Sequence, residues 1–307
     1  MSAPAPPGRG RAAAGAAPGV AARPGYLGRE ETGRMVHPGP RAAERAVAVR
    51  ARVEPVSGVL RAGETVMAGV ARLFAEAGCR GGMVFLDGLT CEPLRYVLPA
   101  LSTDGVHAAW YSDTHSLEDA RIIRATASVG TRDGAAFLHG HGLWQAGRAP
   151  VAMGHLLPFE SVVAADAPVT GLGARDAGFV ARPDDETAFT LFQPEGGGAG
   201  DSLLARIAPG EDVVTSIEAL AAAHGIIDAR LHGLGSIDHV RFAQGGRMDC
   251  LATELRLHGA VLRAGRAQVG IEVVDIAGRI KSGELKRGAN PVGVTLELLI
   301  EPMEDRP

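Results

Sequence analysis

The chain has few cysteines and few aromatic residues, and it lacks any long apolar run. Its three cysteines (Cys79, Cys91 and Cys250) are odd in number and lack the CxxC spacing, which excludes a disulfide-built framework and fits a reducing compartment. Aromatic residues make up 4% of the 307 positions, so any core must be packed from Val, Leu, Ile and Ala. No segment approaches the roughly 20 apolar residues that a membrane-spanning helix needs. We therefore expect a cytoplasmic protein with aliphatic cores and no membrane partner.

The domain organisation follows from length and local composition. A hydrophobic content of 46% over 307 residues is enough for two domains of ordinary size. Residues 1–56 are rich in Ala, Pro, Gly and Arg and lack apolar periodicity, which predicts a disordered tail without the apolar stretch of a secretory signal. Met35 offers an alternative start of translation within it. Residues 195–201 predict a flexible glycine-rich linker between domains at 57–194 and 202–307.

Charge is divided unevenly between the tail and the rest of the chain. Residues 1–56 hold nine Arg and four Glu, whereas the remaining residues hold 22 basic and 31 acidic side chains, a net charge of −9. An acidic body is poorly suited to a phosphate backbone. We therefore expect that nucleic acid is not a partner.

The two halves share a series of landmarks in the same order, which indicates a tandem duplication. Each half begins with a Gly-Glu step and an amphipathic helix, and continues with a short strand that ends in a glycine turn. An Ala-Gly turn and a final apolar strand complete each half. The matching segments are residues 61–66 with 208–213, 66–77 with 213–221, 85–89 with 230–234, 145–147 with 276–278, 154–156 with 283–285, and 160–169 with 292–300.

The first half carries three histidines that point to a metal site. His139 and His141 are two residues apart in a predicted strand, so both side chains face the same side. If the following hairpin is symmetric about Arg148, His155 lies opposite His141, with Cβ atoms about 4.5–5.5 Å apart. Three imidazoles suit zinc and other transition metals, and three protein ligands leave a position open for water or substrate. The competing interpretation is three ordinary histidines on a polar face.

In the second half, the matching positions are Gly270, Glu272 and Glu284. The fold itself therefore does not require histidine there. By the same hairpin arithmetic, Glu272 and Glu284 lie six positions from Gly278 and oppose one another. They are interpreted either as a surface pair with basic neighbours or as carboxylates contributed to the metal of the first repeat.

Gly140 and Gly142 alternate with the histidines along the same predicted strand. They leave its opposite face without side chains. This pattern indicates either a close approach of another backbone or simply a weak strand.

Several further residues are candidates for a fourth metal ligand or for acid or base catalysis. Glu64 opens the first helix, where a favourable charge at the helix N-terminus is its alternative role. Asp87 lies in a Leu-Asp-Gly turn that it alternatively stabilises. Asp113 and His115 belong to a polar loop with aromatic neighbours, which either lines a site or is plain surface. Cys91 is expected to be a buried thiol.

The motifs of the second half resemble the plants-and-prokaryotes-conserved (PPC) domain. The resemblance covers about residues 202–302 and, through the repeat, more loosely residues 57–194. It implies an α/β (α+β) fold of two tandem domains, each a mostly antiparallel sheet with few helices, and trimer-type self-association. The segments that carry it are Pro209–Glu218, His224–Ile226, Leu231–Ile237 and Asp275–Leu285.

The resemblance also implies a metal site. In bacterial members of this family, an HxH strand and a Gly-His-Leu turn hold a metal, a pattern that carries over to His139, His141 and His155. It implies a divalent ion as cofactor, with zinc favoured. Plant members add an AT-hook, of which Arg9-Gly10-Arg11 followed by Ala12 is only a fragment.

Three classes of function remain open at this point. The PPC fold is similar to that of acetolactate decarboxylase, an internal duplication whose zinc is held by three histidines. This similarity implies a metal-dependent enzyme, of lyase, decarboxylase or hydrolase type, acting on a small carboxylate or keto acid. The alternatives are a non-enzymatic DNA-binding or regulatory protein, as the family label suggests, and a metal-stabilised scaffold.

Overall fold

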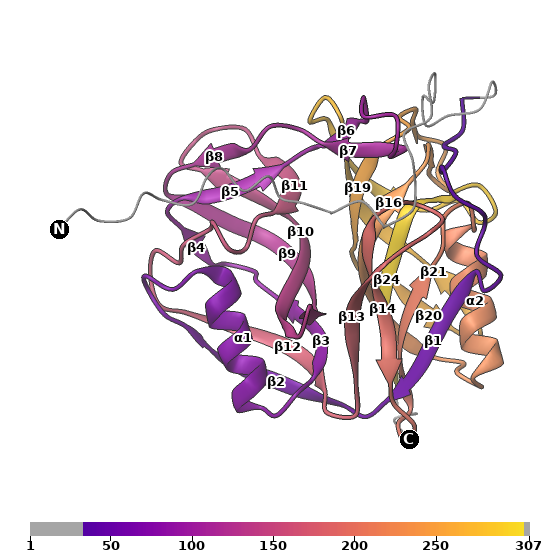
Figure 1. The fold of residues 1–307 in the computed structure, drawn as a ribbon, viewed down its shortest axis with the longest axis horizontal. Helices are drawn as coiled ribbons and strands as arrows, with labels where there is room; N and C mark the ends of the chain where they lie inside the picture. The colour runs from indigo at the N-terminus through magenta and orange to yellow at the C-terminus, as the bar shows by residue number, and fades with distance from the viewer. Residues whose placement is uncertain (1–32, 304–307) are drawn as a thin grey trace.

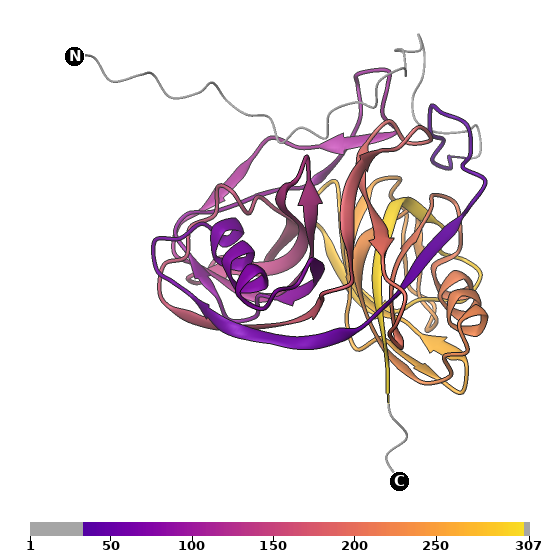
Figure 2. The same ribbon diagram turned by 60° about the horizontal axis from the view of Figure 1, so that its bottom comes forward.

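The computed structural model describes residues 33–303, which form two curved β-sheets that meet along the middle of the molecule (Figure 1). Helices α1 (Val66–Glu76) and α2 (Val213–Ala223) each belong to a different half and lie far apart (Figures 1 and 2). The expected mostly antiparallel fold with few helices is confirmed. Neither of these helices has the length and apolar character needed to cross a membrane.

The first half is an 11-stranded sheet around α1, with the main order β2-β12-β3-β9-β10-β11-β5-β8. Helix α1 begins after Thr65, whose hydroxyl accepts a hydrogen bond from Ala68 N, and its predicted apolar stripe faces the sheet. The strands are β2 (Val53–Leu60), β3 (Gly81–Phe85), β4 (Thr90–Cys91), β5 (Leu94–Val97), β8 (His115–Leu117), β9 (Ala120–Arg132), β10 (Ala135–Ala146), β11 (Ala152–Leu156), β12 (Ala167–Ala174), β13 (Ala177–Pro183) and β14 (Thr190–Gly196).

The second half is a nine-stranded sheet around α2, with the main order β1-β15-β24-β16-β19-β22-β23. Asp212 accepts a hydrogen bond from Thr215 N and begins α2. The strands are β1 (Ala46–Ala51), β15 (Ser202–Ile207), β16 (Ala229–Ile237), β19 (Thr253–Leu257), β20 (Val261–Arg263), β21 (Arg266–Gln268), β22 (Gly270–Asp275), β23 (Ile280–Glu284) and β24 (Val292–Pro302).

Two small hairpins complete the described part of the chain. One consists of β17 (Val240–Arg241) and β18 (Arg247–Met248). The other consists of β6 (Pro99–Leu101) and β7 (Ala109–Tyr111), and we call it the flap. The flap reaches from the first half to the second, where β6 contacts β19 (Figure 1).

Six strands follow the same order in both sheets. The order β2-β12-β3-β9-β10-β11 of the first half corresponds to β15-β24-β16-β19-β22-β23 of the second. In each half the helix follows the first of these six strands along the chain. This correspondence agrees with the repeat in the sequence landmarks, and it makes the histidine-bearing hairpin β10–β11 the counterpart of β22–β23.

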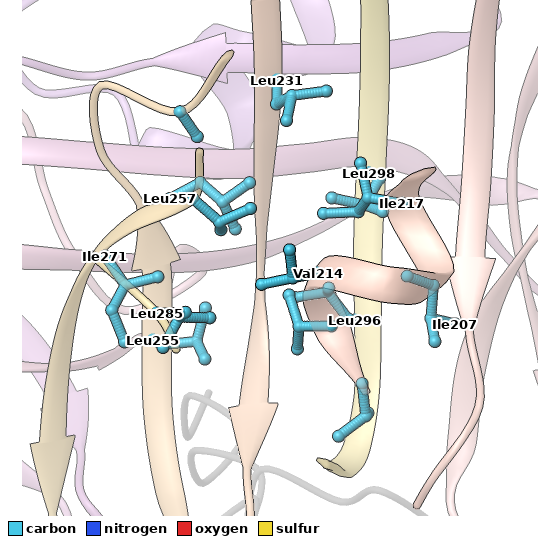
Figure 3. Close-up of a cluster of buried hydrophobic side chains, with 14 of the residues drawn as sticks. Ile207, Val214, Ile217, Leu231, Leu255, Leu257, Ile271, Leu285, Leu296 and Leu298 are labelled. Atoms are coloured by element: carbon cyan, nitrogen blue, oxygen red, sulfur yellow. The ribbon is translucent and has the colours of Figure 1, made fainter. Parts of the chain in front are cut away.

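Aliphatic side chains fill each half, as the low aromatic content predicts. In the second half, Val214 and Ile217 of α2 point toward Leu296 and Leu298 of β24, among other buried Leu, Ile and Val residues (Figure 3). Each such side chain contributes about 1.5–3 kcal/mol when fully buried. A further cluster, which includes Met83, Phe179 and Leu299, contains residues of both halves and holds the two sheets together.

The predicted disorder of the N-terminal tail is wrong for residues 46–56. Strand β1 pairs with β15 from Ala46 opposite Ile207 to Ala51 opposite Ser202, and β2 begins at Val53. Composition missed these strands because β1 is ordered by pairing with a segment about 150 positions later in the chain. The Arg9-Gly10-Arg11 motif lies outside the described residues.

Two other boundaries also differ from the sequence prediction. The glycine-rich linker is packed rather than free, since Gly198 N donates a hydrogen bond to Arg50 O and a Cβ atom on Gly200 would lie 2.0 Å from Ala51 O. The apolar strand predicted at residues 160–169 is β12, Ala167–Ala174, and β13 and β14 follow it, so it is not the last strand of the first half. Most of the segment from residue 160 to the start of β12 forms a loop.

Candidate metal centre

The β10–β11 hairpin brings the three histidines together as predicted. The strands pair His141 with His155, so the hairpin is symmetric about Arg148. His139 lies two residues before His141 on the same face of β10. One ligand nitrogen from each of the three rings lies within 4.8 Å of the others. Local strand geometry is therefore sufficient to form the cluster.

Two glutamates of the second half complete the cluster, and neither was predicted from the sequence. Glu254 of β19 contacts His141 Nε2 through its Oε2 atom, which is also 3.8 Å from His155 Nδ1. Glu297 of β24 places Oε1 2.8 Å from His139 Nδ1. Both glutamates are buried. For Glu297, the available signal was an acidic residue inside a mostly apolar strand, which is uncommon unless the charge has a partner.

The hydrogen bonds of two histidines determine which ring nitrogens are free. His141 Nδ1 lies 2.8 Å from the carbonyl oxygen of Leu255, which can only accept, so Nδ1 carries the hydrogen. His139 Nδ1 donates in the same way to Glu297. In the neutral rings, both Nε2 atoms are then lone-pair acceptors, and they face each other at 3.2 Å. Either a proton or a metal ion between them would satisfy both lone pairs.

The donor set fits a metal ion in this position. Tetrahedral zinc with Zn–N bonds of 2.0–2.1 Å separates its ligand nitrogens by about 3.3–3.4 Å, close to the observed 3.2 Å. Among the described residues, the buried His155 Nδ1 and Glu254 Oε2 atoms have no hydrogen-bond partner. A buried polar atom left unpaired costs about 1–3 kcal/mol. A cation beside both atoms would remove that cost.

The pKa values of His139 and His155 are shifted in opposite directions. Burial alone would lower the pKa of His139, but the charge and hydrogen bond of Glu297 outweigh it and raise the pKa. Burial, together with the neighbouring His139 and His141 rings, holds the pKa of His155 well below its usual value. His155 is therefore neutral near pH 7 and has a free nitrogen lone pair.

Gly142 permits the close packing of β10 against β9. A Cβ atom on Gly142 would lie 2.5 Å from Ala125 Cβ and 2.8 Å from Arg124 O, whereas one on Gly140 would lie 3.0 Å from Ala127 Cβ. The close-approach interpretation therefore applies at both positions, and more severely at Gly142.

We expect Gly142→Ala to lower the free energy of unfolding by about 1–3 kcal/mol, because the added methyl group overpacks a buried strand pair. Gly140→Ala should cost less, since its closest contact is a single methyl group at the longer distance. Urea unfolding of both variants beside the unmodified protein measures the difference. Equal stability of all three proteins would contradict the packing argument.

The histidines lie in a cavity of about 310 Å³ that is lined by both halves. Tyr111 of the flap lines this cavity, and its ring centroid is 5.1 Å from that of His155. Burial raises the pKa of Tyr111, and the charges of Glu254 and Glu297 raise it further. The phenol therefore keeps its proton and can donate a hydrogen bond within the cavity.

The structure does not bring Glu64 or Asp87 to this cavity. Glu64 accepts hydrogen bonds from Arg72 at 3.0 Å, which outweigh the effect of burial and lower its pKa. Asp87 Oδ1 accepts a hydrogen bond from Ala125 N at 3.0 Å. Neither residue lines the cavity. Their contacts are an ion pair with Arg72 of α1 and a hydrogen bond from strand β9.

The remaining candidates also lie outside the site. Asp113 and His115 are exposed and do not line the cavity, although Trp110 and Tyr111 just before them do. Cys91 is buried as expected, and burial raises the pKa of its thiol to about 12.

The predicted opposition of Glu272 and Glu284 is wrong. Strands β22 and β23 pair Glu272 with Ser282 and Gly270 with Glu284. The hairpin is thus centred on Ala277, one residue before the predicted centre. A shift of one residue in the centre moves every cross-strand partner by two, so the two carboxylates do not face each other.

Glu272 instead joins the two halves. Its carboxylate is buried and accepts hydrogen bonds from Arg256 of the same sheet and from Arg124 of the first half. Burial alone would raise the pKa of Glu272, but these two guanidinium groups outweigh it and hold the pKa below its usual value. Glu272 therefore contributes to the interface between the sheets and not to the histidine cluster.

Comparison with known proteins agrees with the fold. The model of the Plants and Prokaryotes Conserved (PCC) domain matches residues 195–303. No curated protein matches the chain. The chain is similar to the solved structure of a candidate DNA-binding protein from Ralstonia eutropha JMP134, with 17% identity, a TM-score of 0.37, and coverage of 45% of this chain and 89% of that one.

Two further solved structures show the same level of similarity. A metal-containing protein from Archaeoglobus fulgidus has 17% identity, a TM-score of 0.37, and coverage of 47% of this chain and 97% of that one. A plant- and prokaryote-conserved protein from Pyrococcus horikoshii has 15% identity, a TM-score of 0.37, and coverage of 48% and 94%. From the family match, residues 195–303 of this chain are a Plants and Prokaryotes Conserved domain.

Proposed function

We propose that this protein is a metal-dependent enzyme, of lyase, decarboxylase or hydrolase type, that acts on a small carboxylate or keto acid. The observation that carries the proposal is the convergence of three histidines beside the buried carboxylate of Glu254 in one cavity. Groups of this kind are typical of catalytic rather than purely structural sites, because three protein ligands leave room for a substrate oxygen. Zinc is the favoured ion, since imidazole nitrogen is among its preferred donors.

In this proposal, each residue of the cavity has a separate task. His139, His141 and His155 hold the ion, while Glu297 and the Leu255 carbonyl orient two of the rings. A bound divalent ion polarises a carbonyl or carboxylate oxygen and stabilises the anion that forms. Glu254 takes a proton from the substrate or from water at Oε2 and returns it to the anion that forms.

Tyr111 has a supporting task at the same end of the cavity. It keeps its proton and donates a hydrogen bond to the developing oxyanion. The protein thereby stabilises negative charge on a substrate oxygen from a side other than that of the ion.

One observation favours a second candidate function, a metal-stabilised scaffold. The histidines belong to the first half and Glu254 to the second, so a bound ion would also connect the two sheets. In that case, chelation should lower the melting temperature, and no organic acid should be converted. The DNA-binding role named for the Ralstonia relative is disfavoured by the net charge of −9 over residues 57–307.

The proposal is tested with zinc-loaded protein and a panel of 2-oxo acids and 2-hydroxy-3-oxo acids, with release of CO₂ and loss of the carbonyl as readouts. We expect turnover of at least one compound. Glu254→Gln should lower turnover by about 100-fold or more, because it removes proton transfer. Glu284→Gln, on the counterpart hairpin, should have no effect. No turnover of any compound, together with a chelator-sensitive melting temperature, would favour the scaffold instead.

A further inference from the structure

The cavity holds a disproportionate share of the aromatic residues of the chain. The protein has 8 Phe, 2 Trp and 3 Tyr. Six of these residues line this one cavity, although the cores of both halves are mainly aliphatic. Metal chemistry does not require such a wall, so the concentration points to the ligand. The six are Trp110, Tyr111, Phe137, Phe159, Phe189 and Phe192.

The rings form two groups in contact rather than six isolated side chains. Phe137 lies 6.1 Å from Phe159 and 5.8 Å from Phe192 between ring centroids, and Trp110 lies 5.7 Å from Phe189. Phe159 is 57% exposed, which is unusual for a large apolar side chain in this protein. Offset and edge-to-face packing at these distances suits a further aromatic ring.

A single cationic side chain, Arg132, accompanies this apolar wall. Among the described residues that line the cavity, it is the one Arg or Lys. Its guanidinium carbon lies 5.5 Å from the centroid of the Phe137 ring. Among the described residues, Arg132 forms an ion pair at 3.9 Å with Asp133, whose side chain is 94% exposed. A pair of that kind contributes little, so Arg132 remains available to an anion.

Arg132 lies opposite Ala135 at the start of β10, and His139 and His141 lie further along that strand. Phe137, under Arg132, precedes His139 by two residues on the same face of β10, a separation of about 6.6–6.8 Å along the strand. Beside the histidines, the carboxylates of Glu254 and Glu297 would balance the charge of a divalent ion. A free anionic group is therefore better placed at Arg132 than beside these carboxylates.

We propose that the cavity binds an organic monoanion with an aromatic body and that its anionic group lies on Arg132. Its role as a substrate rests on the proposed function, whereas the selection for an aromatic anion rests on the wall and on Arg132. This proposal narrows the substrate class from small carboxylates in general to aromatic ones. Short aliphatic acids would leave the aromatic wall without contacts.

The fluorescence of Trp110 provides a direct readout of binding, since this side chain lines the cavity. The other tryptophan, Trp144, is fully buried in the core of the first half and gives a constant background. Three probes separate the contributions: phenylpyruvate has both the ring and the carboxylate, pyruvate lacks the ring, and phenylacetone lacks the charge. We expect phenylpyruvate to bind at least about 10-fold more tightly than either of the other probes. Pyruvate loses the ring contacts, and phenylacetone loses the charge-assisted hydrogen bond.

Arg132→Met is the matched variant, because it keeps an apolar stem over Phe137 and removes the charge. It should weaken phenylpyruvate binding by about 10-fold or more and leave phenylacetone binding unchanged. Arg175→Met, at a surface arginine outside the cavity, should change neither. Pyruvate binding as tightly as phenylpyruvate, or an Arg132→Met variant with unchanged affinity for phenylpyruvate, would overturn the inference.

The same titrations in metal-stripped protein separate this inference from the proposed function. If the histidines hold no metal, the Arg132-dependent preference for phenylpyruvate over phenylacetone is still expected. Loss of that preference in a protein that does bind metal would overturn the aromatic-anion inference alone.

Discussion

His141→Ala is expected to weaken metal binding by at least about 100-fold, since outer-shell partners of a metal site alone are worth 10–100-fold. His141 is central to the cluster, because its Nε2 atom lies 3.2 Å from His139 Nε2 and contacts Glu254. The variant leaves two histidines that cannot enclose an ion. Metal content after dialysis, and competition with a chromophoric chelator, measure the loss.

Two other variants make the metal experiment specific. Glu297→Gln should weaken binding by about 10–100-fold, because His139 loses the carboxylate that orients it. His115→Ala removes an exposed histidine outside the cluster and should leave metal content unchanged. Equal metal content in the unmodified protein and in His141→Ala would disprove the proposed metal centre.

Glu272→Ala is expected to destabilise the protein by about 3–5 kcal/mol, the usual cost of removing one partner of a buried ion pair. Arg256 donates to Glu272 Oε2 at 2.6 Å and is itself buried. Without Glu272, its guanidinium would keep only the hydrogen bonds to Thr126 of the first half. Chemical denaturation at pH 7 measures the change. Glu284→Ala, on the neighbouring strand β23, should stay within about 0.5 kcal/mol.

The stabilisation by Glu272 should depend on pH in a defined direction. Because its pKa is lower in the folded protein than the usual glutamate value, folding favours the charged carboxylate. The contribution is therefore complete above the usual value of about 4.3. It is lost as the pH falls through the lower pKa of the folded state. A stability difference between the two proteins that grows on acidification would contradict this assignment.

Replacement of both partners tests whether the cost comes from the unpaired charge. A Glu272→Leu, Arg256→Leu double variant should be much closer in stability to the unmodified protein than Glu272→Ala, because no charge is left buried without a partner. If the double variant is as unstable as Glu272→Ala, the loss comes from packing at the interface.

Local patterns correctly predicted the parts of this protein that depend on neighbouring residues. Helices α1 and α2 follow from apolar spacing and capping residues. The pairing of His141 with His155 follows from a period of two along a strand and a symmetric turn. The same arithmetic failed for Glu272, because one residue of difference in the turn centre changes every opposing pair.

The sequence by itself thus determined the histidine triad, the two helices and the shared order of landmarks, all of which arise from interactions within one half. Only the tertiary structure decided that Glu254 and Glu297 meet the histidines and that six aromatic residues gather around them with Arg132. It also decided that β1 joins the second sheet. These features depend on how two sheets pack against each other, and strand periodicity contains no information on contacts between distant segments.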